Sequence, residues 1–367
     1  MISKVKSLIY FFLNPKIKDY KKNFSKKIKI ADVGSAGDKD FQGMFWKKLE
    51  DISYYYYFDP SNNEKKKNRN YIIFPNGLWD KNEKQKIYIT NFPFASSIFK
   101  PNQKMLKRFI NYESHKVLKE EYLDLKKLDD IIFKKNDFCD FIKIDAEGSE
   151  LKILNGCKKN LENSLGLEVE INFIEKNLSS PSAIDVIKFL EKNNFTLYLL
   201  NRESWRKNNK NNILSNHQLI WADAIFFKSE QYLFDELKKI EDKENKNLKI
   251  YKLLALMIVY KLYDTAEYYI DFFEEKKLID TDQKLEFTNF IKKNIESNLT
   301  IFLKTTSLVF ISLIVMPIIF LTLSKKIIKS YLTFLKILNT RLITLIINSY
   351  RFTGPNKVAV SEKSKEL

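Results

Sequence analysis

Residues 27–40 read KIKIADVGSAGDKD, and residues 51–61 read DISYYYYFDPS. Each stretch contains a run of alternating or aromatic residues that is typical of a strand. The first run enters a turn that holds Gly34 and Gly37, two of only eight glycines in the chain. The second run ends at Asp59. In open α/β sheets ligands bind at the carboxyl ends of parallel strands, so the two stretches predict a doubly wound α/β domain with its site at that edge.

Further strands and helices continue this pattern along the chain. Strands are expected over 70–80, 84–92, 141–144, 166–173, 195–200 and 219–227, and helices over 101–110, 151–163 and 182–193, with a short helix within 115–132. Strands that alternate with helices imply a mostly parallel sheet that is covered on both faces. The last two strands have no helix between them, so we expect an antiparallel pair at one edge.

The composition changes after Lys228, where helical periodicity replaces the alternation of strands. We place a domain boundary near residue 235. The expected organisation is a basic amphipathic N-terminal segment over 1–27, an α/β domain over 28–235, an all-α extension over 236–300, a membrane-associated segment over 301–352 and a polar tail over 353–367.

The positive charge of the chain is concentrated at its ends. The net charge is +17, from 63 Lys and Arg against 46 Asp and Glu. Residues 1–30 hold nine lysines and one acid, and residues 301–367 hold ten basic residues and two acids. A nearly neutral middle disfavours a nucleic-acid-binding domain, whereas two basic ends suit an anionic membrane surface. The two cysteines, Cys139 and Cys157, exclude a disulfide framework and favour a reducing compartment.

Residues Thr305 to Leu323 form an uncharged stretch of nineteen residues, interrupted by Pro317. As a helix it would be roughly 28 Å long, close to the thickness of a bilayer core, and a buried core helix is the alternative. A span would export Lys325 and the basic residues after it, against the preference of such residues for the cytoplasmic side. We therefore expect an interfacial arrangement in which the catalytic domain is cytoplasmic and the protein is membrane-associated.

The ligand class follows from what surrounds the glycine turn. An acid at the end of the second strand can accept hydrogen bonds from both hydroxyls of a ribose. The turn has no Gly-x-Gly-x-x-Gly pattern and no basic residue for a pyrophosphate, which disfavours a dinucleotide. An adenosine ligand without a phosphate bridge remains, and S-adenosylmethionine is the common one. A turn that merely needs a positive φ is the structural alternative for these glycines. The candidate cofactor-binding residues are Asp32, Gly34, Ser35, Gly37, Asp59, Pro60 and Asn76.

Residues 28–228 resemble the FkbM-type methyltransferases. The resemblance rests on ADVGSAGDKD, YYYYFDPS, NGLWDKNEKQKIYIT with Ser96 and Ser97, WADAIFF and, above all, FIKIDAEGSELKILNGC followed by LEVEINF. The chain has Ala-Glu-Gly where that family often has a valine or a Gln-Gly pair, a difference that concerns the acceptor side. The resemblance implies a class I (Rossmann-like) sheet and S-adenosylmethionine-dependent O-methylation of hydroxyls on sugars, polyketides and similar acceptors.

The candidate catalytic residues are Asp145, Glu147, Glu170 and His217. Methyl transfer needs a group beside the methyl that takes the acceptor proton, and Asp145 ends a strand at the same edge as Asp59. The alternatives are that Asp145 and Glu147 cap a helix, that Glu168 and Glu170 form a surface pair, and that His217 is a solvated loop residue. The four candidates together suggest a divalent ion, but no paired-His spacing supports one, and we predict no metal.

The sequence thus predicts an O-methyltransferase of the S-adenosylmethionine-dependent class. Its expected acceptor is a glycan or lipid-linked sugar hydroxyl, in surface-polysaccharide or glycolipid modification. The rival hypothesis is a catalytically inactive, membrane-attached binding module of a polysaccharide assembly system. Methylation of nucleic acid is disfavoured, because the chain lacks the Asn/Asp-Pro-Pro-aromatic segment that grips a base edge.

Overall fold

The computed structural model describes residues 17, 23–34, 49–61, 66–132, 137–208 and 217–295. Residues Lys16–Ile295 form one compact unit. The predicted membrane-associated segment and polar tail lie outside the described residues, as do Ser35, Gly37 and most of the N-terminal segment. No helix of the described part is long and apolar enough to cross a membrane. The structure therefore gives no support to the membrane-type segment, which stays a prediction.

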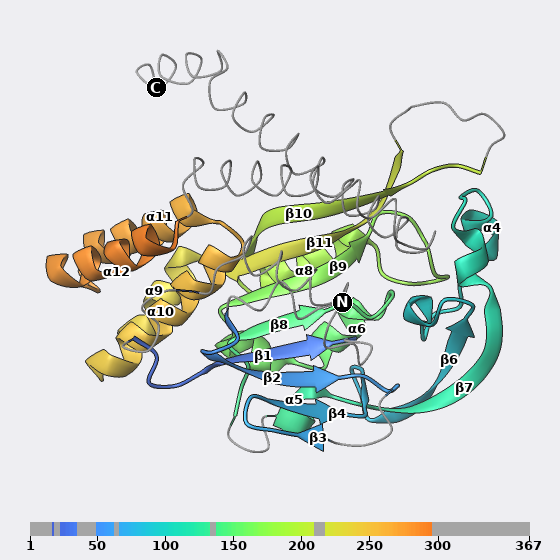
Figure 1. Cartoon of the computed structure of the whole chain (residues 1–367), viewed down its shortest axis with the longest axis horizontal. Coiled ribbons are helices and arrows are strands. Elements are labelled where there is room, and N and C mark those ends of the chain that lie inside the picture. The colour runs from blue at the N-terminus through green and yellow to red at the C-terminus, as the bar shows by residue number, and fades with distance from the viewer. Residues whose placement is uncertain are drawn as a thin grey trace, which may run out of the picture. The chain divides into compact units, whose positions relative to one another are not determined.

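The described residues build a central sheet of eight strands in the order β10-β11-β9-β8-β1-β2-β4-β3 (Figure 1). The strands are β1 Ile28–Val33, β2 Ser53–Phe58, β3 Lys66–Lys67, β4 Tyr71–Phe74, β8 Phe141–Ile144, β9 Gly166–Asn172, β10 Phe195–Trp205 and β11 Gln218–Lys228. The five strands β4, β2, β1, β8 and β9 run parallel, whereas β11 is antiparallel to both β9 and β10. The mostly parallel sheet with an antiparallel pair at one edge is thus confirmed.

Strand register brings polar side chains together on one face of this sheet. Asp32 on β1 pairs with Lys143 on β8, which pairs in turn with Glu168 on β9. Because side chains alternate between faces, Ile28 and Ile30 share the face of Asp32 but lie nearer the amino end of the strand. One half of this face is therefore apolar, and the half at the carboxyl ends is polar.

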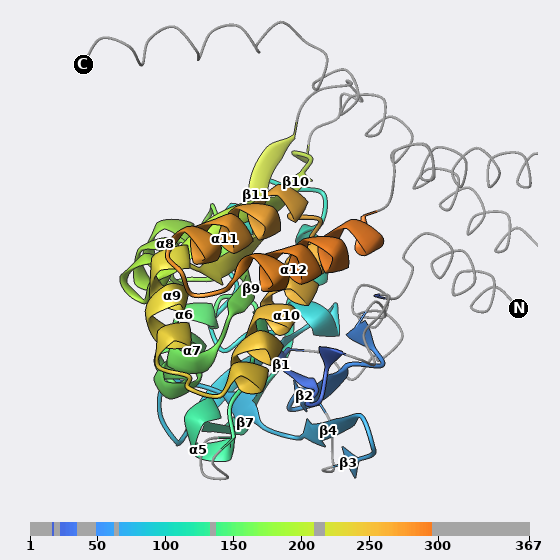
Figure 2. The same cartoon turned by 90° about the vertical axis from the view of Figure 1, so that its left-hand side faces the viewer.

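Helices cover both faces of the sheet. One face packs against α5 Leu128–Ile132, α6 Glu150–Asn155, α7 Lys158–Asn163 and α8 Ala183–Lys192. The other packs against α9 Glu230–Lys238, α10 Lys243–Val259, α11 Tyr263–Glu275 and α12 Thr281–Asn294. Figure 2 shows α10, α11 and α12 grouped on one side of the molecule. The helical extension thus shares a core with the sheet, and the predicted boundary at residue 235 stays a prediction.

Two of the predicted helices differ from expectation in detail. Ser182 caps α8 with a full capping box; the sequence leaves Ser180 and Ser182 open as the cap. The helix expected over 151–163 is instead two short helices, α6 and α7, separated at Gly156. A Cβ at this glycine would lie 2.0 Å from the Trp79 carbonyl oxygen, so only glycine allows the contact. The helix expected from Pro101 is α4 Gln103–Leu106, capped by Asn102.

A second, three-stranded sheet lies apart from the central one (Figure 1). Its order is β5 Gly77–Leu78, β7 Val117–Lys126 and β6 Glu83–Thr90. The sequence predicts β6 and the short helix α5, but it does not predict β7. Most of this strand is exposed to solvent, and it carries charges on both faces. Of its three residues that line the cavity described below, only Leu123 and Leu125 are apolar. Two 3-10 turns, η2 Pro93–Ala95 and η3 Tyr112–His115, flank α4 in sequence.

Candidate active site

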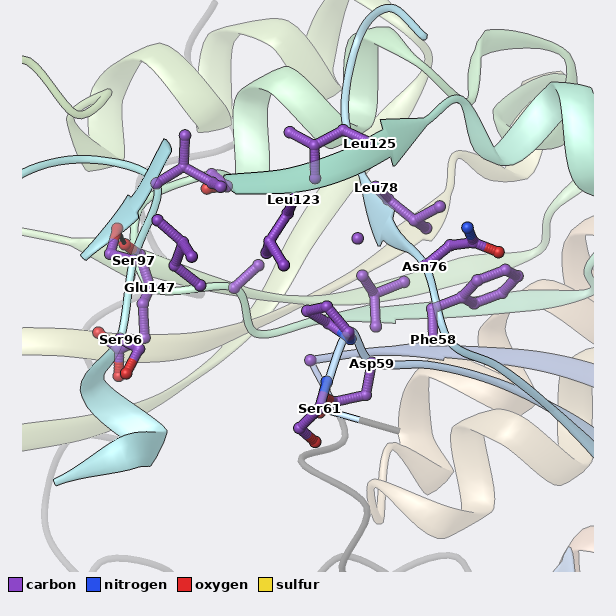
Figure 3. Close-up of a pocket in the computed structure, with 18 of the residues that line it drawn as sticks. Phe58, Asp59, Ser61, Asn76, Leu78, Ser96, Ser97, Leu123, Leu125 and Glu147 are labelled. Carbon is purple, nitrogen blue, oxygen red and sulfur yellow. Dashed lines mark hydrogen bonds between the residues drawn. The ribbon is translucent and has the colours of Figure 1, made fainter. Parts of the chain in front are cut away.

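A cavity of about 420 Å³ lies at the carboxyl ends of β1, β2 and β8 (Figure 3). In Figure 3, Phe58 and Asn76 lie toward one end, whereas Ser96, Ser97 and Glu147 lie toward the other. Asp59 and Ser61 lie beneath the space between these ends. The cavity thus extends from the strand end that carries Asp59 to the loop that carries Glu147. We call this loop, residues 145–150, the motif loop.

The small sheet forms an apolar wall of this cavity. Ile87 and Ile89 of β6 and Leu123 and Leu125 of β7 all line it. These residues alternate along their strands, so their neighbours point away from the cavity. Tyr122, for example, is 71% exposed. A period of two on each strand therefore gives the small sheet one face toward the cavity and one toward solvent.

Gly34 sets how closely β1 approaches the loop after β8. Its φ is +83°, and a Cβ at this position would lie 1.8 Å from the Asp145 carbonyl oxygen. The Asp145 amide also donates a hydrogen bond to the Val33 carbonyl at 3.0 Å. The structural alternative for this glycine, a turn that needs positive φ, is therefore met, and Gly34 lines the cavity as well.

The loop from Asp145 to Glu150 has an unusual backbone that several hydrogen bonds hold in place. Glu147 has a φ of +51° and Gly148 a φ of +100°. The Glu150 carboxylate accepts hydrogen bonds from the amides of Ala146 and Gly148, each at 3.0 Å. Glu150, rather than either candidate catalytic acid, therefore satisfies the amides of this loop, which argues against the capping alternative for Asp145 and Glu147.

The carbonyl of Glu147 receives two further hydrogen bonds. Ser97 donates to it from its hydroxyl at 2.6 Å, and Asn177 donates from its amide at 2.8 Å. A non-glycine residue with positive φ is costly by about 1–3 kcal/mol, so it persists where the surroundings fix it. These contacts fix the backbone of Glu147 at the edge of the cavity.

A buried lysine pairs with two of the candidate carboxylates. Lys176 is 2% exposed; its Nζ lies 2.7 Å from Glu147 Oε2 and donates to Glu170 Oε1 at 3.0 Å. Burial raises the pKa of Glu147, and it raises the pKa of Glu170 to about 7, while the ammonium acts in the opposite direction. Carboxylate oxygens of Asp145, Glu147 and Glu170 lie within 4.8 Å of one another, a spacing that suits a cation. The Lys176 ammonium already supplies positive charge there.

A second buried polar cluster lies on the face of the sheet that the helical extension covers. Burial raises the pKa of Asp32 to about 7, whereas the Lys143 ammonium lowers it. Burial likewise raises the pKa of Asp223 on β11 to about 7. Tyr260, at the end of α10, donates a hydrogen bond to Glu168 Oε2 at 2.6 Å. The extension is therefore bonded directly to the polar half of the sheet.

The predicted site residues that the structure describes fall into three groups. The cavity is lined by Gly34, Asp59, Pro60, Asn76, Asp145 and Glu147. Asp32 and Glu170 are buried in the sheet outside the lining, and both members of the Glu168 and Glu170 pair are buried rather than on the surface. His217 is exposed just before β11 and does not line the cavity. The chemical roles of all these residues stay predictions.

Sequence reasoning does not identify Lys176 or Lys143 as parts of this region. It names Glu150 within the FkbM-like IDAEGSE motif, at a spacing from Gly156 that resembles the family, but assigns it no role in the site. Lys143 interrupts an otherwise apolar buried strand, which is a weaker signal. Lys176 follows β9 in a segment with no distinguishing pattern, and only the fold brings it to Glu147 and Glu170.

Comparison with known proteins identifies a domain family. No curated protein and no solved structure matches the chain. A family model described as the methyltransferase FkbM domain matches residues 32–197. This range runs from β1 into β10 and includes every described residue that lines the cavity. The resemblance drawn from the sequence motifs is thereby confirmed, and the chain carries a methyltransferase FkbM domain over residues 32–197.

Proposed function

We propose that this protein transfers a methyl group from S-adenosylmethionine to a hydroxyl of a sugar or glycan. The FkbM domain supports a methyltransferase that depends on S-adenosylmethionine. The observation that carries the proposal is a single cavity that contains Asp59, from the end of β2, and both Asp145 and Glu147, from the loop after β8. A ligand-binding acid and two proton-accepting acids thus face one space.

The lining of the cavity fits the cofactor. Asp59 is buried at a strand end, where a carboxylate can accept hydrogen bonds from ribose hydroxyls. Gly34 brings backbone rather than a side chain to the cavity, and Asn76 offers an amide on the same side as Phe58. The acids in the lining suit a ligand that carries a positive sulfonium.

S-adenosylmethionine, when bound, supplies a methyl group that an acceptor oxygen can attack in line. The task of this chain is to hold the hydroxyl in that line and to take its proton as the new bond forms. Asp145 and Glu147 are the carboxylates of the loop after β8 that line the cavity. Glu147 suits proton uptake because burial raises its pKa, and Lys176 fixes its position. Glu170 has a positioning role through the same lysine.

Calorimetric titration with S-adenosylmethionine and S-adenosylhomocysteine tests cofactor binding. Asp59→Ala should lower the affinity for both ligands by about tenfold or more, because it removes hydrogen bonds from the ligand to a charged acceptor. Asp124→Ala, on the exposed face of β7, is the matched control and should leave both affinities unchanged. Equal affinities in Asp59→Ala and the control would contradict the ribose assignment. Binding without methyl transfer to any glycan in a panel would favour the inactive binding module.

We also propose that the two basic ends hold the protein on the anionic inner leaflet, with the catalytic domain in the cytoplasm. The support is the charge distribution of the sequence, with basic excess in residues 1–30 and 301–367. Co-sedimentation with vesicles of anionic phospholipid tests this, with the chain ended after about residue 298 as the comparison. Equal binding by the two chains, or binding to neutral vesicles alone, would contradict the proposal.

A further inference from the structure

The described residues that line the cavity include acids but no basic side chain. The acids are Asp59, Glu121, Asp145 and Glu147, and no Lys, Arg or His is among the lining residues within the described ranges. This is notable in a chain with 63 Lys and Arg. Lys119, Lys143 and Lys176 contact three of these acids, Glu121, Asp145 and Glu147, as ion-pair partners and are not themselves lining residues.

An exposed pair of aromatic rings includes one ring that lines the same cavity. Phe92 and Phe94 are 50% and 51% exposed, and their ring centroids are 5.1 Å apart. Phe94 lines the cavity. An exposed aromatic pair beside a cavity offers a flat apolar surface to a ligand, because each ring can pack against C–H groups.

The loop that carries this pair is fixed at its base. Tyr88 and Ser97 form an antiparallel bridge across the ends of the loop. The Thr90 amide donates to Ser96 Oγ at 3.2 Å, and the Ser97 hydroxyl donates to the Glu147 carbonyl at 2.6 Å. The aromatic pair is therefore held in register with the motif loop, and its ordering does not have to be supplied by a ligand.

A buried hydroxyl with no partner lies in the lining as well. Ser149 is 3% exposed and lines the cavity, and its Oγ has no hydrogen-bond partner among the described residues. A buried polar atom without a partner is unfavourable, so a ligand hydroxyl at this position would gain affinity.

We propose that the end of the cavity formed by Ser97, Glu147, Ser149 and Phe94 binds an uncharged sugar ring, free of phosphate and carboxylate groups, with one face of the ring on Phe94. The proposal rests on the proposed function in that it takes the acceptor to be a sugar. It narrows that class to neutral sugars. A phosphate or carboxylate here would lie beside the carboxylates of Asp145 and Glu147, and the lysines that contact these two acids, Lys143 and Lys176, are already paired with carboxylates.

Saturation-transfer NMR on the full chain, with S-adenosylhomocysteine present, tests the charge of the ligand. The neutral probes are glucose, galactose, mannose and N-acetylglucosamine, and the charged probes are glucuronic acid, galacturonic acid and glucose 6-phosphate. Signal is expected from at least one neutral probe and from none of the charged ones. Signal from a charged probe equal to that of its neutral counterpart overturns the proposal, as does the absence of signal from every neutral probe.

Variants in the small sheet and in the loop after β6 test whether the ligand binds in the cavity. Phe94→Ala should lower the affinity for the neutral probe by roughly tenfold. Tyr122→Ala, which removes an exposed ring on the outer face of β7, should leave that affinity unchanged. Glu121→Lys should raise binding of the charged probes, whereas Glu120→Lys, one residue away, should not, because only Glu121 lines the cavity. Equal effects within either pair overturn the proposal. If the unaltered protein does not bind S-adenosylhomocysteine, the proposed function is contradicted instead. The same NMR measurements without S-adenosylhomocysteine then test the sugar site by itself.

Discussion

Ser97 donates a hydrogen bond of 2.6 Å to the carbonyl oxygen of Glu147, a residue fifty positions further along the chain. The bond connects the loop of the small sheet to the motif loop of the central sheet. Ser97 Oγ also accepts a hydrogen bond from the Phe99 amide at 3.0 Å. One hydroxyl therefore sets the spacing between two walls of the cavity.

Ser97→Ala should separate acceptor binding from cofactor binding. The substitution leaves Asn177 as the remaining side-chain donor to the Glu147 carbonyl and removes the acceptor of the Phe99 amide. We expect a loss of about 1–2 kcal/mol in the free energy of unfolding and a higher KM for the acceptor, with cofactor affinity unchanged. Urea unfolding, steady-state kinetics and calorimetry measure these quantities. Ser114→Ala is the control, and a variant that loses cofactor affinity instead would contradict the assignment of this wall.

Gly34→Ala should be far more damaging than Gly77→Ala. At Gly34 a Cβ would lie 1.8 Å from a backbone oxygen, and φ is +83°, so neither the neighbour nor the residue can adjust. At Gly77 the Cβ would meet the end of the Leu125 side chain at 2.5 Å, and that side chain can rotate. We expect a loss of more than about 3 kcal/mol for Gly34→Ala in urea unfolding, and a clearly smaller loss for Gly77→Ala. Similar losses in both variants would contradict this reading of the strand end.

The parallel strands could be predicted from sequence because each is a local pattern. The runs at 28–33, 53–58 and 141–144 are apolar over several consecutive or alternating positions and end in an acid or glycine. Acids and glycines at strand ends converge in any parallel sheet, so the positions of Asp59 and Asp145 follow from topology alone. Their shared cavity confirms that step of the inference.

The rest of the site depends on contacts between distant segments. The strand β7 reads VLKEEYLDLK, and its pairing with β6 decides its conformation more than its own propensity does. Lys176 reaches Glu147 through a turn after β9, which no local pattern encodes. The Gly156 contact with Trp79 likewise joins two motifs that are separate in the sequence. Tertiary contacts of this kind cannot be read from the amino-acid sequence of a single protein.

Lys176→Met should change the pH dependence of catalysis as well as stability. The ammonium lowers the pKa of both Glu147 and Glu170, so its removal raises both. If Glu147 accepts the acceptor proton, the acidic limb of the pH profile of kcat/KM moves to higher pH, because the carboxylate stays protonated longer. We also expect a loss of about 3–5 kcal/mol in stability, since two buried carboxylates lose their partner.

Two comparisons separate this effect from general destabilisation. Lys176→Arg retains the charge and should keep the acidic limb near that of the unaltered protein. Lys152→Met removes the partner of Asp80, outside the cavity lining, and should leave the profile unchanged. An acidic limb that is the same in Lys176→Met and Lys152→Met would contradict the proton-accepting role of Glu147.

Glu150→Gln should flatten the dependence of stability on pH. Burial raises the pKa of Glu150 to about 8 from an ordinary value of 4.5. Between these values the folded protein holds a proton that the unfolded chain releases, so the free energy of unfolding contributed by this group falls as pH rises, by at most about 1.4 kcal/mol per pH unit. That contribution is fully present below about pH 4.5 and is lost above about pH 8.

Glutamine keeps a carbonyl oxygen for the amides of Ala146 and Gly148 but does not titrate. Urea unfolding at several values between about pH 5 and 8.5 should therefore show that the free energy of unfolding of Glu150→Gln rises relative to that of the unaltered protein as pH rises. For the exposed control Glu120→Gln, the difference from the unaltered protein should stay constant over this range. Parallel curves for Glu150→Gln and the unaltered protein would mean that Glu150 is ionised in the folded state throughout this range.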